Sequence, residues 1–320
     1  MRVDRVFRRR RSAWGALAAA LIATPLAHAS AGHAATAPTP SALSAPAQAL
    51  VPRGDLLAET GIGLSRRLRV LDRAGHPVRR SAPLIRRGMW SAIELARDRR
   101  HAFVSSCRPC FALGPASDEA EPAVLYELNL ADGHKRFIAH AVSPALSPDH
   151  TRLAYLALRP IPEMYERTAL VVRDLRTGAQ RSIPFVPTVS IGAPPELIVN
   201  WSPDGRLIAL VDKAETVALV EPNTAISIGA QPPLAGEAPV FLDSNTLIVL
   251  ANCCTGRQRL VAVDTRSGAR SPFAQVSSVP VYMRRIGEGR LLVVTILGEL
   301  VVVSKRRSRV IATDVYTAAL

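Results

Sequence analysis

The sequence predicts an all-β fold, a six-bladed β-propeller closed by strands from both ends of the chain. Three features of the sequence lead to this prediction. A turn flanked by two apolar strands recurs five times after residue 50, a second hairpin follows each copy, and an incomplete sixth unit precedes the first copy. Units of about 40–50 residues that each contribute four strands are typical of propeller blades.

The first hairpin of each repeat turns around an acidic residue. Aspartate suits such a turn because its side chain bonds the nearby backbone, and glycine suits it because it accepts a positive φ. We therefore expect five acidic residues to act as turn caps: Asp98, Asp149, Asp204, Asp243 and Glu288. The five copies of the motif span residues 94–104, 145–155, 200–210, 240–250 and 284–294.

The second hairpin supplies the two outer strands of each blade. Its turns are expected at residues 131–133, 176–178, 222–224, 266–268 and 306–308. The five complete blades then span about residues 88–139, 140–185, 196–229, 237–275 and 279–313.

The sixth blade is assembled from both ends of the chain. Leu56–Glu59, Leu68–Asp72 and Val78–Arg80 are expected to form its second, third and fourth strands. Val315–Leu320 is expected to supply the missing first strand. Joining the two ends in one sheet hides strand edges that would otherwise favour aggregation.

Two of the copies carry a more specific motif. Ser147-Pro148-Asp149 and the run Trp201-Ser202-Pro203-Asp204-Gly205-Arg206-Leu207-Ile208-Ala209 resemble the TolB-type, WD-like propeller repeat. The resemblance covers residues 50–320 and implies a six-bladed β-propeller over that range. It implies no particular activity, because one fold carries many unrelated functions.

The N-terminus has the pattern of an export signal. The basic run Arg8–Arg11, the apolar stretch Ala13–Leu26 and the site Ala27-His28-Ala29 predict a signal peptide over residues 1–29. An uncleaved membrane anchor is the alternative. Residues 30–49 are rich in Ala, Pro, Ser and Thr and are expected to form a linker. We expect a protein that is secreted, periplasmic or held in the cell envelope, with no membrane span after cleavage.

The formal net charge of +14 indicates what kind of partner the protein binds. A basic surface favours anionic ligands. The arginines are scattered and do not alternate with aromatic residues, so we expect no nucleic-acid binding. The expected partner is an unknown protein or an anionic ligand of the envelope or the extracellular space, bound by a monomer.

The longest expected connections lie on one face of the propeller, which we call the loop face. They include residues 107–122 and 158–167, whereas the turns on the opposite face are short. Because long loops on a rigid scaffold carry function, the sequence predicts a binding site there. The residues assigned to this site are Arg108, Phe111, Glu163, Met164, Tyr165 and Arg257.

All four cysteines fall on the loop face. In an exported protein, we expect Cys107 to pair with Cys110 and Cys253 to pair with Cys254. The second pair would be strained, because neighbouring Cα atoms lie only about 3.8 Å apart. Bridges across the ring, a four-cysteine zinc site and redox activity of Cys107–Cys110 are the alternatives.

No catalytic motif is present. The sequence has no Gly-x-Ser-x-Gly nucleophile elbow and no His-Glu-x-x-His metal site. We therefore expect no catalytic residue, no metal and no cofactor, and we interpret the protein as a non-catalytic binding scaffold. The alternative is a propeller hydrolase or lactonase with a metal in the central channel. Asn200 and, beside the adjoining turn, Asp243 are the candidate ligands for that metal.

Overall fold

The computed structural model divides the chain into two units, Met1–Ala47 and Gln48–Leu320. The first unit contains the expected signal peptide and most of the expected linker, and it lies outside the described residues. The structure describes residues 50–61, 67–78, 90–108, 121–161, 164–184, 199–211, 216–224, 226–228, 234–235, 237–251 and 257–320.

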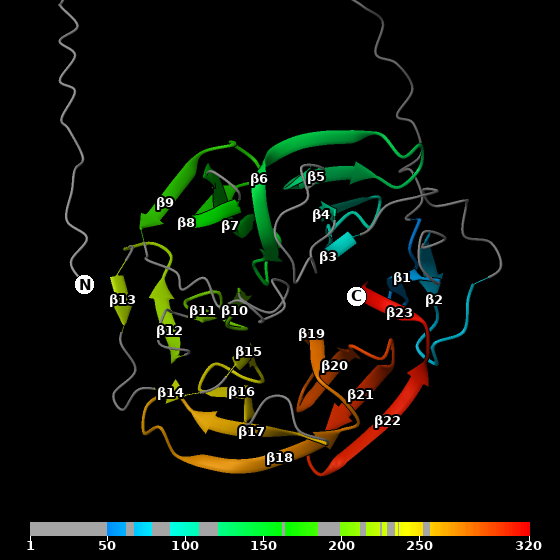
Figure 1. The fold of residues 1–320 in the computed structure, drawn as a ribbon, viewed down its shortest axis with the longest axis vertical. Helices are drawn as coiled ribbons and strands as arrows, with labels where there is room; N and C mark the ends of the chain where they lie inside the picture. Colours follow the sequence, from blue (N-terminus) through cyan, green and yellow to red (C-terminus); the bar gives the residue numbers. More distant parts are fainter. Residues whose placement is uncertain are drawn as a thin grey trace, which may run out of the picture. The chain divides into compact units, whose positions relative to one another are not determined.

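Every regular element of the described residues is a β-strand. No helix occurs among these residues, and so none there has the length and hydropathy that a membrane crossing requires. The expectation of an all-β fold is therefore confirmed for the described part of the chain. Within the second unit, the sheets are arranged around a common centre (Figure 1).

The largest sheet has seven antiparallel strands. One strand, β6 (Lys135–Leu146), pairs through its first half with β5 and through its second half with β7, with a register shift between Val142 and Ala145. The strands on either side, in sheet order, are β3 (Trp90–Leu95), β4 (His101–Arg108) and β5 (Glu121–Asn129), then β7 (Arg152–Ile161), β8 (Met164–Asp174) and β9 (Gln180–Pro184).

Three further sheets follow along the chain, and neighbouring strands in each are antiparallel. The first contains β10 (Asn200–Trp201), β11 (Ile208–Val211), β12 (Thr216–Glu221) and β13 (Ile226–Ile228), with β14 (Leu234–Ala235) also paired to β12. The second contains β15 (Glu237–Phe241), β16 (Thr246–Ala251), β17 (Gln258–Asp264) and β18 (Arg270–Val276). The third contains β19 (Pro280–Gly287), β20 (Arg290–Thr295), β21 (Leu300–Ser304) and β22 (Arg307–Ala312).

The last sheet joins strands from the two ends of the second unit. β1 (Leu56–Thr60) lies between β2 (Arg67–Leu71) and β23 (Val315–Ala319) and pairs antiparallel with both. Ala58 stands opposite Ala318 in this register. The strand expected at the C-terminus is therefore observed, and its partner is the strand expected at Leu56–Glu59.

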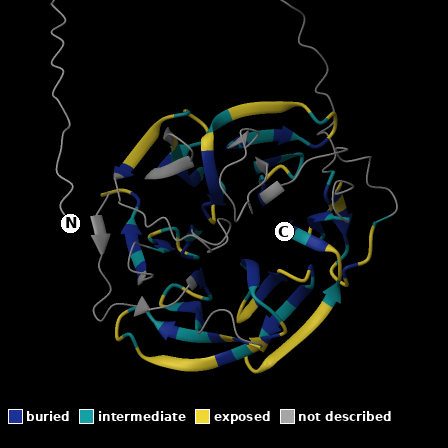
Figure 2. Ribbon diagram, in the orientation of Figure 1, coloured by how far each residue is buried: buried dark blue, intermediate teal, exposed yellow. Residues whose placement is uncertain are grey.

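The apolar core lies between the sheets and is divided into six clusters among the described residues. Each cluster joins side chains of two successive sets of strands. One cluster, for example, joins Leu57 of β1 with Ile93 of β3, and another joins Ala58 of β1 with Leu292 of β20. The strands at the rim are exposed, as β18 and β22 show in Figure 2. The strands β16 and β20 are buried on both faces over most of their length, as their β-branched and leucine-rich sequences favour.

The predicted turn caps are confirmed at four positions. Asp98 accepts hydrogen bonds from the backbone N–H groups of Arg100 and His101. Asp149, Asp204 and Asp243 each accept one from the backbone N–H two residues further along the chain. Glu288 lies exposed in the turn between β19 and β20, where no such bond involves it.

Two expected segments differ from the observed ones. The expected loop over residues 158–167 is mostly a continued antiparallel ladder, in which Pro160 stands opposite Tyr165 and Ile161 opposite Met164. The expected strand Val78–Arg80 is described only through Val78, and its neighbour Pro77 forms an isolated bridge with Leu71. The sequence also gave no sign of β14, a two-residue strand on β12.

Candidate functional site

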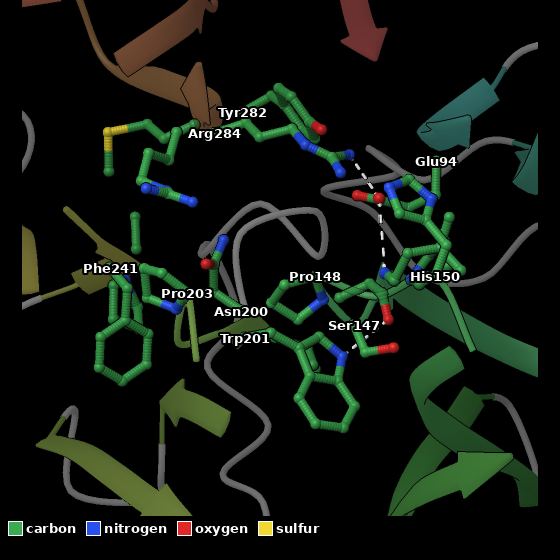
Figure 3. A pocket seen from close by; sticks show the side chains of 18 residues that line it. Glu94, Ser147, Pro148, His150, Asn200, Trp201, Pro203, Phe241, Tyr282 and Arg284 are labelled. Carbon is green, nitrogen blue, oxygen red and sulfur yellow. Dashed lines mark hydrogen bonds and ion pairs between the residues drawn. The ribbon is translucent and has the colours of Figure 1, made fainter. Parts of the chain in front are cut away.

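A cavity of ≈ 120 Å³ lies where the inner strands β3, β6, β10, β15 and β19 approach one another. Such a volume accommodates roughly four water molecules or a small ion. Figure 3 shows the polar and aromatic side chains that face it, which include Glu94, His150, Asn200, Trp201, Tyr282 and Arg284.

An ion pair between the buried carboxylate of Glu94 and the partly exposed guanidinium of Arg284 crosses one side of the cavity. Glu94 of β3 and Arg284 of β19 form a direct bond between Oε2 and Nη1 (Figure 3), although 190 positions separate them in the sequence. The backbone N–H of Leu146 in β6 donates to the same carboxylate oxygen at 3.4 Å. One carboxylate therefore links three inner strands.

Burial determines the ionisation of this pair. It raises the pKa of Glu94 above its ordinary value, because the loss of hydration outweighs the stabilisation of the carboxylate by Arg284. Burial also opposes the charge of Arg284, but the carboxylate outweighs it, and the pKa of Arg284 is raised. The guanidinium therefore remains charged at any physiological pH.

Two buried polar atoms beside this pair have no hydrogen-bond partner among the described residues. They are the hydroxyl of Tyr282, a residue that is 5% exposed, and Nδ1 of His150. Glu94 and Arg284 nevertheless lie near enough to the hydroxyl of Tyr282 to act on it by charge and by side-chain hydrogen bonding. Both Tyr282 and His150 line the cavity, although the hydroxyl and Nδ1 atoms themselves have almost no accessible surface.

The cavity carries a positive electrostatic field. Burial, followed by the charges of Arg284 and Arg97, lowers the pKa of His150. Arg285 also lines the cavity, and Glu94 is the one carboxylate among the described lining residues. Its charge is already offset by Arg284. A neutral histidine beside two arginines suits an anionic or hydrogen-bond-accepting ligand.

The same residues do not fit the metal ion of the alternative hypothesis. Asn200 does line the cavity, but Asp243 caps the N–H of Asn245 in the neighbouring turn. No group of three His, Cys, Asp or Glu side chains comes together in the described part of the chain. A divalent cation at the cavity would face Arg284 and Arg285.

Trp201 combines packing with a place in the cavity wall. It is buried in the cluster between β6–β9 and β10–β12, and its indole N–H donates to the carbonyl of Ala145 at 2.9 Å. Both needs of a buried indole, apolar contact and a hydrogen-bond acceptor, are thus met by protein atoms.

Most residues predicted for the loop-face site are not described in full. Phe111, Glu163, Cys110, Cys253 and Cys254 lie outside the described residues, and only the backbone is described at Cys107, Arg108, Met164 and Tyr165. Arg257 is exposed just before β17. The loop-face site and the disulfide pairing therefore stay predictions.

One sequence signal could have identified the cavity. Four of the five repeat copies begin with a residue that lines it: Glu94, Ala145, Asn200 and Arg284. A glutamate and an arginine at the same repeat position of two copies are complementary in charge. A comparison of the first residue of each copy would have predicted an ion pair between β3 and β19.

Comparison with known proteins identifies the fold. No family model matches the sequence, and no curated protein is significantly similar to it. The structure is similar to TolB from Acinetobacter baumannii, with 14% identity, a TM-score of 0.50 and coverage of 83% of this chain and 65% of that one. The chain thus spans slightly less than two thirds of that TolB chain.

Two other solved structures are more distant. The β-propeller domain of the trilobed protease from Pyrococcus furiosus has 13% identity and a TM-score of 0.42, covering 70% of this chain and 71% of that one. An oligogalacturonate lyase in complex with manganese has 11% identity and a TM-score of 0.47, covering 78% and 71%. Neither superposes closely enough to bear on function. The all-β architecture and the likeness to TolB show that this chain has a TolB-like β-propeller fold.

Proposed function

We propose that residues 50–320 form a closed six-bladed propeller that is exported and binds a small anionic ligand in its central cavity without catalysing a reaction. The seven-stranded sheet counts as two blades that share β6, since the two halves of that strand pair with different neighbours. With the other four sheets this makes six blades. The six apolar clusters supply one core for each junction between successive blades.

Contacts among the inner strands support closure of the ring. Along the ring, each of these strands contacts the next in the order β23, β3, β6, β10, β15, β19 and back to β23. The pairing of β1 with β23 would then complete the sixth blade. The pattern leaves no inner strand at an open end of the ring.

Ligand binding is supported chiefly by the positive charge of the cavity wall, where Arg284 and Arg285 face the space and Glu94 is the one carboxylate among the described lining residues. A ligand carboxylate or phosphate would lie in the field of these two arginines. The one serine among the described lining residues, Ser147, is engaged in its own turn, where its hydroxyl donates to Asp149 at 2.5 Å and accepts from the N–H of Arg152 at 2.9 Å. We therefore assign binding and no chemical step to this cavity.

Export is proposed from the leader over residues 1–29, and it would place the propeller outside the cell, in the periplasm or in the cell envelope. The resemblance to TolB-type repeats is compatible with that location. The loop face, with its four cysteines, remains the proposed surface for a protein partner.

A thermal-shift screen of small anions, including phosphate, citrate and glucuronate, tests the proposed site. At least one should raise the Tm of the wild-type protein. Arg285→Gln should weaken binding about tenfold, because it removes a positive charge from the cavity wall. Arg290→Gln, which removes an exposed arginine of β20 outside the described lining, is the matched control. If no anion binds, or Arg285→Gln binds like wild type, the cavity is not the ligand site.

A further inference from the structure

A second, larger groove of ≈ 770 Å³ lies at the rim of the ring of sheets. Its walls come from β17, β18 and the turn between β21 and β22, which belong to neighbouring sheets. In Figure 1, β18 and β22 lie side by side at the periphery, and the two strands are also in contact. The backbone N–H of Arg306 in the turn donates to the carbonyl of Phe273 at 2.7 Å, which fixes one wall of the groove against the other.

Four arginines surround this groove, and none of its described lining residues is acidic. They are Arg257, Arg259, Arg306 and Arg307, and all four are exposed. None of the four has an ion-pair partner in the part of the chain that the structure describes. By contrast, Arg136 in the exposed first half of β6 is paired with Glu127. The groove therefore concentrates uncompensated positive charge at one place on a basic protein.

The spacing of two of these arginines is that of an extended chain. Arg257, in the bend just before β17, and Arg259 of β17 flank Gln258, which is 1% exposed, and both arginines line the groove. Alternate residues of a strand lie about 6.8 Å apart. An extended peptide presents every second side chain at the same interval, so two carboxylates at positions i and i+2 would match two guanidinium groups.

The floor of the groove suits the other side chains of such a peptide. Val261, Pro272 and Ala274 line it and offer partly exposed apolar surface between the arginines. Pro272 has no N–H group, and the carbonyl of Phe273 is already bonded to Arg306. Two adjacent backbone groups of β18 are thus unable to pair with a further strand, and side-chain contacts must carry the recognition.

We propose that this groove, which we call the rim groove, docks an extended acidic segment of a partner protein in which carboxylates alternate with apolar residues. The site is separate from the central cavity and does not depend on the ligand proposed there. An anionic polysaccharide and a lipid surface would also meet the four charges. Neither provides side chains that alternate between acidic and apolar at the strand interval.

Fluorescence anisotropy at low salt tests this assignment with the full-length mature protein. The probes are a labelled peptide in which Asp and Val alternate, and a peptide of the same composition with its four Asp residues in one block. Wild type should bind the alternating peptide about tenfold more tightly than the block peptide. Raising the salt concentration should weaken both interactions.

Two variants with the same change in net charge separate the rim groove from general attraction. Arg257→Ser/Arg259→Ser/Arg306→Ser/Arg307→Ser should lose binding about tenfold, as expected for several exposed ion pairs that each contribute weakly. The control carries serine at four exposed arginines elsewhere, Arg176, Arg206, Arg266 and Arg290, and should bind like wild type. The double variant Arg257→Ser/Arg259→Ser should abolish the preference for the alternating peptide. It provides an independent test if the fourfold variant does not fold.

Three results would overturn the proposal. Equal losses in the two fourfold variants would mean that net charge alone attracts the peptide. Equal affinity of wild type for the two peptides would show that the spacing of Arg257 and Arg259 does not select an alternating sequence. Tighter binding of polygalacturonate or of anionic vesicles than of the peptide, lost in the groove variant, would assign the groove to a different class of partner.

Discussion

At the scale of single residues, the ion pair of Glu94 and Arg284 is the most consequential contact in the structure. It joins β3 to β19 beside β23, and the N–H of Leu146 adds β6 to the same carboxylate. Burying two charges gives little net stability compared with apolar packing, but leaving one of them alone is costly. The pair therefore specifies which inner strands come together more than it stabilises the fold.

A double-mutant cycle tests this interpretation. Arg284→Met should lower the free energy of unfolding by about 3 kcal/mol, because it leaves the buried carboxylate of Glu94 without its partner, and Glu94→Leu should lower it by less, because the guanidinium of Arg284 is partly exposed. The double variant should lose much less than the sum of the two. Urea denaturation at neutral pH measures all three free energies.

The exposed pair of Arg136 and Glu127 provides the control, since such pairs are worth less than about 1 kcal/mol. Additive losses at Glu94 and Arg284 would show that the two side chains do not act as a unit. Sequence alone placed neither residue in a site, because the contact joins positions that are 190 apart. In the sequence, Glu94 and Arg284 are related only because each is the first residue of a copy of the repeat motif.

At the scale of elements, the Ser-Pro-Asp turn is explained by its hydrogen bonds. Ser202 donates to Asp204 at 2.6 Å and accepts from the N–H of Leu207 at 2.9 Å, and Ser147 makes the same two contacts in its own turn. Both serines are buried. The motif was readable from sequence because every bond spans at most five residues.

Neighbouring turns are also tied to each other. Arg152 at the start of β7 donates to the carbonyl of Gly205 at 3.2 Å, and its guanidinium lies 4.7 Å from the ring centroid of Trp201. This contact links two copies of the repeat through a cation–π interaction. Nothing in the local sequence of either turn predicts it, because the partners are some fifty residues apart.

The turn at Asp149 gives stability a specific pH dependence. Burial opposes ionisation of this carboxyl, but hydrogen bonds from Ser147 and Thr151 outweigh it and lower the pKa from 3.8 to about 2. A pKa that is lower in the folded state stabilises the protein above the unfolded pKa. The contribution is lost as the pH falls from about 4 to about 2.

Asp149→Asn should therefore be less stable than wild type at neutral pH, and the difference should disappear near pH 2. Urea midpoints measured across this range give the comparison. Ser147→Ala removes the strongest favourable contact and should move the loss toward pH 4. A gap between wild type and Asp149→Asn that stays constant with pH would contradict the proposed role of the carboxylate.

The sequence predicts the hairpins of the repeats, but it does not predict the central cavity or the extended ladder of β7 and β8. Turn residues and alternating apolar residues fix each hairpin locally, and for that reason β3–β4, β15–β16 and β19–β20 appear where the sequence predicts them. The continued ladder of β7 and β8 contains prolines and charged residues that favour a loop. Its pairing depends on tertiary context, which local propensity does not contain.

At the scale of the whole second unit, contacts between its two ends matter most. Gly75, in the turn after β2, has φ +90, and a Cβ there would lie 2.2 Å from the carbonyl oxygen of Ile311 in β22. The N-terminal strands are thus packed closely against the C-terminal sheet. The pairing of β1 and β23 likewise brings strands from the two ends of the second unit into one sheet.

If β1 and β23 close the ring, the strands at the two ends of the second unit should be as stable as those in its middle. In a closed ring, the amides of Val315–Ala319 should exchange only when the whole domain unfolds. An open ring would let that strand fray by itself and exchange early.

Native-state hydrogen exchange, followed by mass spectrometry, measures this directly. The account predicts equal protection for peptides that cover β1, β23 and the central strand β16, with all three exposed in the same unfolding step. Rapid exchange of β23 while β16 stays protected would contradict a ring closed through the two ends of the chain.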